Sequence, residues 1–228
     1  MRSLDSITFD AGIFTLHGDE EGVRIWHTVA GDGVALFYFP IPPDIPGDLA
    51  SLEDVRSGYR KRTAASGNAI IEVETPMVDG CQAVRAIIKV PQQPHGLVYL
   101  GSLTLPFRDF SYLIKVQCEE LGITGLRDSE VLAELLGTGE VTLDINSDEG
   151  RLTGWMQDPY DASIVTTFAR NRAEAEEYDA RFPDHPLSRL RTTLNHIQGT
   201  LRVEDGISSE PRFVFQRTQH QRPWWKMW

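Results

Sequence analysis

Cysteine, basic charge and long apolar runs are all scarce in this 228-residue chain. Two cysteines, Cys81 and Cys118, are too few for a disulfide framework. No apolar run approaches the ~20 residues of a membrane-spanning helix, and no secretion signal opens the chain, so we expect a cytoplasmic protein without a membrane span. With 22 basic against 33 acidic residues, the net charge is −11, which disfavours nucleic-acid binding.

Short catalytic motifs are absent as well. The sequence holds no GxSxG, no phosphate-binding GxxxxGK(S/T), no GxGxxG and no HExxH. None of the six histidines forms a pair at metal-ligand spacing along the chain, and no CxxC accompanies them. The sequence therefore predicts no metal site and no cofactor, and it identifies no catalytic residue.

What the chain does contain is a series of three strands near its middle. Apolar and polar residues alternate over Phe110–Cys118 and, less sharply, over Ala83–Val90, whereas Leu97–Leu105 is apolar on both sides. A strand that is apolar on both faces belongs inside a sheet, and short connections favour antiparallel neighbours, so we expect a meander. Within the middle strand, Gly101 is expected to let another backbone or a bulky ring come close.

The remaining elements surround this meander. Apolar residues at helical spacing predict helices near 51–63, 129–136 and 186–198, the last two stopped by Gly137 and Gly199. Alternation and turn residues predict short strands at 6–9, 13–17, 23–28, 34–39, 69–74, 140–145, 200–203 and 213–215. The sequence thus predicts one α+β domain over 1–228, with a mostly antiparallel sheet and flanking helices.

Residues 146–182 give weaker signals. Asn146–Gly150 is expected to form an acidic turn, and Trp155 and Met156 a short strand. Asp158–Asp161 is expected to be a mobile loop. Asn171 and Glu174 have the spacing of a capping box and predict a polar helix that runs to Tyr178. His185 precedes the helical Pro186, which indicates a capping or loop residue rather than a metal ligand.

One polar cluster deserves a functional interpretation. Asp109, Lys115, Gln117 and Glu119 lie on one side of the third meander strand. We favour a ladder of cross-strand ion pairs with Arg85 or Lys89. The alternative is a polar pocket for a small ligand, or an enzyme (a hydrolase or isomerase) that uses Asp109, Lys115 or Glu119 as acid–base groups.

The C-terminal segment 217–228 is rich in tryptophan, with Trp224, Trp225 and Trp228 close together. Such a segment is costly to leave in water. The sequence leaves three interpretations open: the segment folds back on its own domain, docks on a partner or a neighbouring subunit, or touches a membrane interface. We favour folding back or simple fraying over docking, and we keep these tryptophans as candidate partner-docking residues.

Two stretches, Val90–Phe107 and Phe182–Arg191, resemble a group of uncharacterised bacterial proteins. The order of elements (hairpins, a helix, an antiparallel meander and a long C-terminal helix) resembles the PsbP-like superfamily. That resemblance implies an α/β/α sandwich that binds another protein without catalysis. We therefore expect a soluble, non-enzymatic accessory or interaction protein whose partner is an unknown protein or a second copy of itself.

Overall fold

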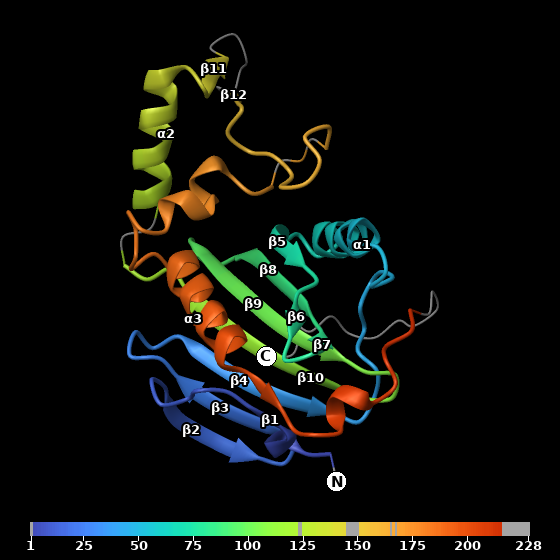
Figure 1. The fold of residues 1–228 in the computed structure, drawn as a ribbon. Helices are drawn as coiled ribbons and strands as arrows, with labels where there is room; N and C mark the ends of the chain where they lie inside the picture. Colours follow the sequence, from blue (N-terminus) through green and yellow to red (C-terminus); the bar gives the residue numbers. More distant parts are fainter. Residues whose placement is uncertain (1, 123–124, 145–150, 165, 167, 216–228) are drawn as a thin grey trace.

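The computed structural model describes residues 2–122, 125–144, 151–164, 166 and 168–215. Its centre is a seven-stranded antiparallel sheet in the order β2-β3-β4-β10-β9-β8-β5 (Figure 1). In chain order these strands are β2 (Thr15–Glu20), β3 (Val23–His27), β4 (Gly33–Phe39), β5 (Ala69–Glu74), β8 (Val84–Pro91), β9 (Leu97–Pro106) and β10 (Ser111–Glu119).

Helices and short strand pairs complete the described part of the chain. The α-helices are α1 (Leu52–Ala64), α2 (Leu126–Thr138) and α3 (Pro186–Thr200). The 3₁₀ helices are η1 (Leu4–Ser6), η2 (Arg172–Glu174), η3 (Glu176–Tyr178) and η4 (Ile207–Ser209). The short antiparallel pairs are β1 (Ile7–Thr8) with β13 (Arg202–Val203), β6 (Met77–Val78) with β7 (Cys81–Gln82), and β11 (Thr142–Asp144) with β12 (Arg151–Thr153). The predicted α+β class with a mostly antiparallel sheet is confirmed.

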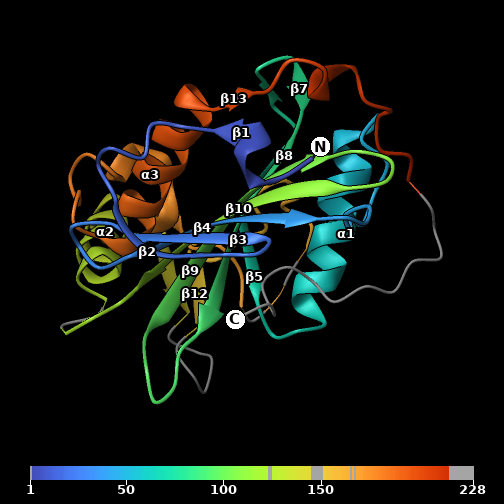
Figure 2. The ribbon, with the colours of Figure 1, turned by 90° about the horizontal axis from the view of Figure 1, so that it is seen from below.

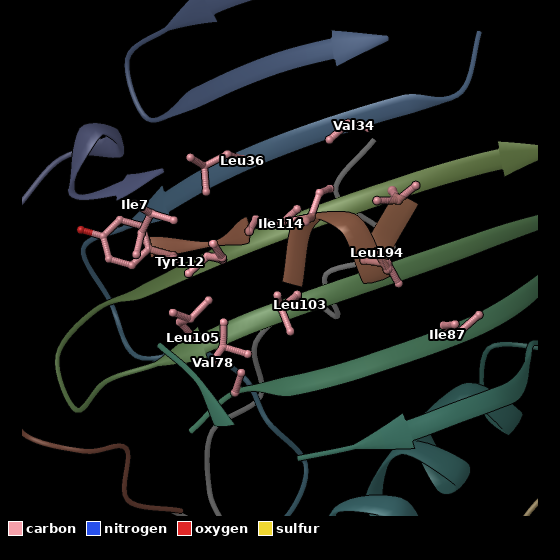
Figure 3. Packing of buried hydrophobic residues seen from close by; sticks show 14 of the residues in the cluster. Ile7, Val34, Leu36, Val78, Ile87, Leu103, Leu105, Tyr112, Ile114 and Leu194 are labelled. Atoms are coloured by element: carbon pink, nitrogen blue, oxygen red, sulfur yellow. The ribbon is translucent and has the colours of Figure 1, made fainter. Parts of the chain in front are cut away.

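The predicted meander forms as β8, β9 and β10, with β9 between the other two. Helix α3 packs across one face of it, which we call the α3 face (Figures 1 and 3). Leu190 and Leu194 of this helix lie over Gly101, where an added Cβ would stand only 2.6 Å from Leu194 Cδ1. The close approach expected at Gly101 is therefore confirmed, but two leucine side chains make it instead of a backbone or a ring.

Helix α1 covers part of the opposite face, which we call the α1 face (Figure 2). Its buried Val55 and Tyr59 pack with apolar residues of β5 and β8 such as Val73. Ser51 begins the helix by accepting a hydrogen bond from the Asp54 N–H at 3.2 Å. The sheet thus has helices on both faces, because both faces of its central strands are apolar.

A smaller cluster lies beyond one end of the sheet and is built from α2, β11, β12 and the segment around η2 (Figure 1). Its buried apolar residues are Val131, Leu135, Val141, Trp155 and Ala173. This group, which we call the α2 lobe, is a separate hydrophobic cluster from those on the two faces of the sheet. Polar side chains, among them the Lys89–Glu174 ion pair, connect this lobe to the sheet.

Two predicted helix ends are wrong. Gly137 lies inside α2, and the left-handed Gly139 (φ 79°) ends that helix instead. Gly199 lies inside α3, which continues to Thr200. An added Cβ at Gly137 or Gly199 would meet no atom within 4 Å, so both glycines occupy open helical positions. A glycine costs such a position about 1 kcal/mol but does not require the helix to stop.

The predicted mobile loop at Asp158–Asp161 is also wrong. The Asp158 carboxylate is buried and accepts two hydrogen bonds from Arg60 of α1, at 2.7 and 3.0 Å. The Tyr160 hydroxyl accepts from the Val73 N–H and donates to the Val73 carbonyl, on the outer side of edge strand β5. The loop is therefore anchored to α1 and to the sheet edge by polar contacts that local sequence does not encode.

Other expectations near the C-terminal half also change. Residues 171–178 form η2 and η3 rather than one helix, although the capping box of Asn171 and Glu174 is present. Met156 makes only an isolated bridge to Asn171, and the strand in this region is β12. The expected strand at 213–215 does not form. The expected acidic turn at 146–150 lies outside the described residues.

Candidate functional site

A cleft of about 420 Å³ lies where β10 ends, α2 begins and the chain enters α3. Its ionisable lining residues are Glu119, Glu120, Arg127, Arg181, Asp184, His185 and Arg189. A neighbouring hollow of about 260 Å³ shares Ala30, Glu119 and Leu121 with it. This end of the sheet therefore collects polar side chains around two adjoining depressions, and we treat it as the candidate site.

His185 is held rigidly in the wall of the cleft. Its Nδ1 accepts a hydrogen bond from the Leu187 N–H at 3.2 Å, which caps α3 as the sequence predicts. Its Nε2 lies 3.7 Å from the Glu120 carboxylate, and its ring contacts Tyr99 edge-on. Glu120 is fixed in turn by the Leu97 N–H at 2.8 Å. His185 and Glu120 thus stabilise the wall of the cleft.

Beneath this wall lies a buried ionic cluster. The Glu174 carboxylate accepts hydrogen bonds from Lys89 Nζ at 2.8 Å, from the Tyr99 hydroxyl at 3.0 Å and from the Asn171 N–H at 2.7 Å. Lys89 and Glu174 are 2% and 0% exposed. Burial raises the pKa of Tyr99 and, together with the nearby Glu174 charge, that of Asp128. This cluster joins the α2 lobe to the sheet.

The arginines that line the cleft are already paired. Arg127 is fully buried and bonds Asp179 at 2.9 Å. Arg181 pairs with Glu130 and Glu134, and Arg189 pairs with Asp32 at 2.8 Å. Among the described residues, neither Glu119 nor Asp184 has an ion pair through its carboxylate. The charge that the cleft presents for a ligand is therefore negative.

The four polar residues predicted to share a face do not form one site. Gln117 and Glu119 meet through a hydrogen bond of 2.8 Å and line the smaller hollow. Asp109 precedes the far end of β10 and pairs with its exposed neighbour Arg108 at 3.2 Å. At about 3.4 Å per residue, ~30 Å of strand separate Asp109 from Glu119. An acid–base set of Asp109, Lys115 and Glu119 therefore does not converge.

The predicted charge ladder is wrong as well, because its members lie on opposite faces. Lys115 lies two residues after Leu113, which packs in the apolar cluster on the α1 face, so its side chain belongs to that face. Lys89 pairs with Tyr99 and Arg85 with Leu103, which places both on the α3 face. There Arg85 bonds Glu72 at 2.6 Å and Lys89 bonds Glu174. Alternation within β10 shows which β10 residues share a face with Lys115. It does not show which residues of the neighbouring strands lie on that face.

Lys115 should make stability depend on pH. Its side chain is fully buried, and burial lowers its pKa to about 7 from an unfolded value of about 10.4. Between these values the unfolded chain binds the proton and the native protein does not. The free energy of unfolding should therefore rise with pH, by up to about 1.4 kcal/mol per unit. Urea unfolding at about pH 7 and 9 measures this rise.

The comparison variants isolate the contribution of Lys115. Lys115→Met removes the titrating amine and should flatten the rise, whereas Lys61→Met, at an exposed position of α1, should leave it unchanged. Equal slopes in wild type and Lys115→Met would show that Lys115 keeps the same protonation in both states.

Sequence reasoning missed several parts of the site. The sequence pattern marks His185 only as a capping or loop residue and Glu174 only as half of a capping box, and it does not single out Asp184. No local signal shows that Glu174 is buried beside Lys89. The candidate docking residues Trp224, Trp225 and Trp228 lie outside the described residues.

Within the described ranges, no group of three or more His, Cys, Asp or Glu side chains is arranged to hold a metal ion. None of the helices in that part of the chain is long and apolar enough to cross a bilayer. No protein-family model matches the sequence, and no curated protein matches it either. The site must therefore be interpreted from its own chemistry.

Proposed function

We propose that this chain is a non-catalytic accessory protein that binds a protein partner through the cleft at the end of β10. The observation that carries the proposal is the charge balance: each arginine in the lining is neutralised, while Glu119 and Asp184 remain available. Such a surface suits a lysine or arginine side chain of a partner, because complementary charges guide association and fix register. The element order that resembles the PsbP-like superfamily points to the same class of function.

The cellular setting is part of this proposal. Cys81 and Cys118 are both free and buried, and burial raises the pKa of each thiol. Unpaired thiols fit a reducing compartment, so we propose a cytoplasmic protein. The net charge of −11 favours a basic partner over nucleic acid.

Selection of peptides from a random library tests the proposal. Peptides enriched on the wild-type protein should carry Lys or Arg and should bind more weakly as salt rises. The Glu119→Gln/Asp184→Asn double variant should bind them about tenfold more weakly by fluorescence anisotropy, because two charge pairs of ~1 kcal/mol or less are lost. Asp109→Asn, at the far end of β10, is the matched control.

Two results would overturn the proposal. One is enrichment of peptides without cationic residues. The other is unchanged binding by the double variant while the control also binds normally. Circular dichroism of each variant verifies that the fold is intact, so that a loss of binding reports on the carboxylates.

A further inference from the structure

The hairpin of β2 and β3 contains an irregularity that places two histidines together. Leu16 pairs with Trp26 and Gly18 with Ile25, so His17 is an extra residue between two paired positions. Such a β-bulge re-aims the side chain at its site. In this hairpin it brings the imidazole of His17 beside that of His27, which is ten residues away in the sequence.

The two rings lie at a distance that suits a shared metal ion. Their centres are 4.6 Å apart and their planes are inclined by 34°. A metal bound 2.0–2.1 Å from an imidazole nitrogen lies about 3.1 Å from the ring centre. Two such ligands at a right angle therefore have ring centres about 4.5 Å apart. Both side chains are exposed, so their rings can turn toward an ion without disturbing the core.

The surroundings favour a cation. His27 lines the smaller hollow together with Glu119, whose carboxylate has no ion pair among the described residues, and the whole chain carries a net charge of −11. No third His, Cys, Asp or Glu of the described residues completes a cluster, so water or an external ligand would fill the other positions. Imidazole nitrogens suit nickel, copper and zinc, whereas magnesium prefers oxygen ligands.

We propose that His17 and His27 form a two-imidazole site for one divalent transition-metal ion, with its remaining coordination positions open. This site borders the smaller hollow, which adjoins the acidic cleft and shares Glu119 with it, but it does not depend on the function proposed above. It departs from the expectation drawn from histidine spacing along the sequence, because the bulge and the strand pairing create the proximity.

Calorimetric titration of the full-length protein without a histidine tag tests the proposal, with NiCl₂, ZnCl₂ and MgCl₂ as probes. We expect one nickel or zinc ion per chain and no heat from magnesium. Loss of one of two imidazole ligands should weaken binding at least about tenfold in His17→Ala and in His27→Ala. His95→Ala removes a different exposed histidine and should bind like the wild type.

The outcomes separate the proposed site from binding elsewhere. Loss in both hairpin variants but not in His95→Ala supports the pair. Binding as tight as that of the wild type in either hairpin variant, or no binding of nickel and zinc by the wild type, overturns the proposal. Thermal unfolding without metal should be similar in all the variants, which shows that a loss of binding does not arise from unfolding.

Discussion

Replacing Glu174 with alanine should destabilise the protein by about 3–5 kcal/mol, the loss expected when one partner of a buried ion pair is removed. The Lys89 ammonium would remain 2% exposed without its carboxylate, and the Tyr99 hydroxyl and Asn171 N–H would lose their acceptor. Urea unfolding monitored by circular dichroism measures the change in the free energy of unfolding.

Two further variants test whether the loss of stability arises from the buried ion pair. Glu176→Ala removes an exposed carboxylate two residues away and should change stability by less than about 0.5 kcal/mol. Lys89→Met combined with Glu174→Gln removes both buried charges and should recover part of the loss. If Glu174→Ala behaves like Glu176→Ala, the buried cluster does not hold the α2 lobe to the sheet.

Gly58→Ala in α1 should cost about 3 kcal/mol, because a methyl group at this position would overlap the carbonyl oxygen of Pro46. The obstacle is backbone, so it cannot yield by a change of rotamer. Helix propensity alone would favour alanine by about 1 kcal/mol. The expected sign is therefore opposite to that of an ordinary glycine replacement in a helix.

Gly137→Ala in α2 is the matched control. Its added methyl group would meet no atom within 4 Å, so the variant should be more stable than the wild type by up to about 1 kcal/mol. Thermal unfolding of both variants provides the comparison. Shifts in the same direction would show that α1 does not pack against Pro46 as described.

The central part of the fold is predictable because its signals are local. Alternation over Phe110–Cys118 reports directly which residues of β10 share a face, and short connections determine antiparallel pairing. The same applies to His185 at the start of α3, where a side chain caps its own helix. The helix ends predicted at Gly137 and Gly199 are wrong because a helix tolerates a solvent-exposed glycine when its other turns pack well.

The candidate site was largely hidden from the sequence, because partners distant in the chain create it. The sequence predicts that Lys89 pairs across strands with the polar side of the third meander strand, but Glu174 reaches it from 85 residues further along and makes its burial tolerable. The pairing of His17 with His27 depends on a bulge that no residue pattern marks. Only Glu119 and Gln117, two residues apart on one strand, were grouped correctly.

The position of Tyr160 has a consequence for how molecules of this protein aggregate. Its hydroxyl and Arg56 occupy the outward backbone groups of Val73, so a strand from a second molecule cannot pair with β5 at Val73 without displacing them. The other edge of the seven-stranded sheet is β2. An obstacle at one edge disfavours growth of the sheet in both directions, whereas a sheet with two bare edges can polymerise into fibrils.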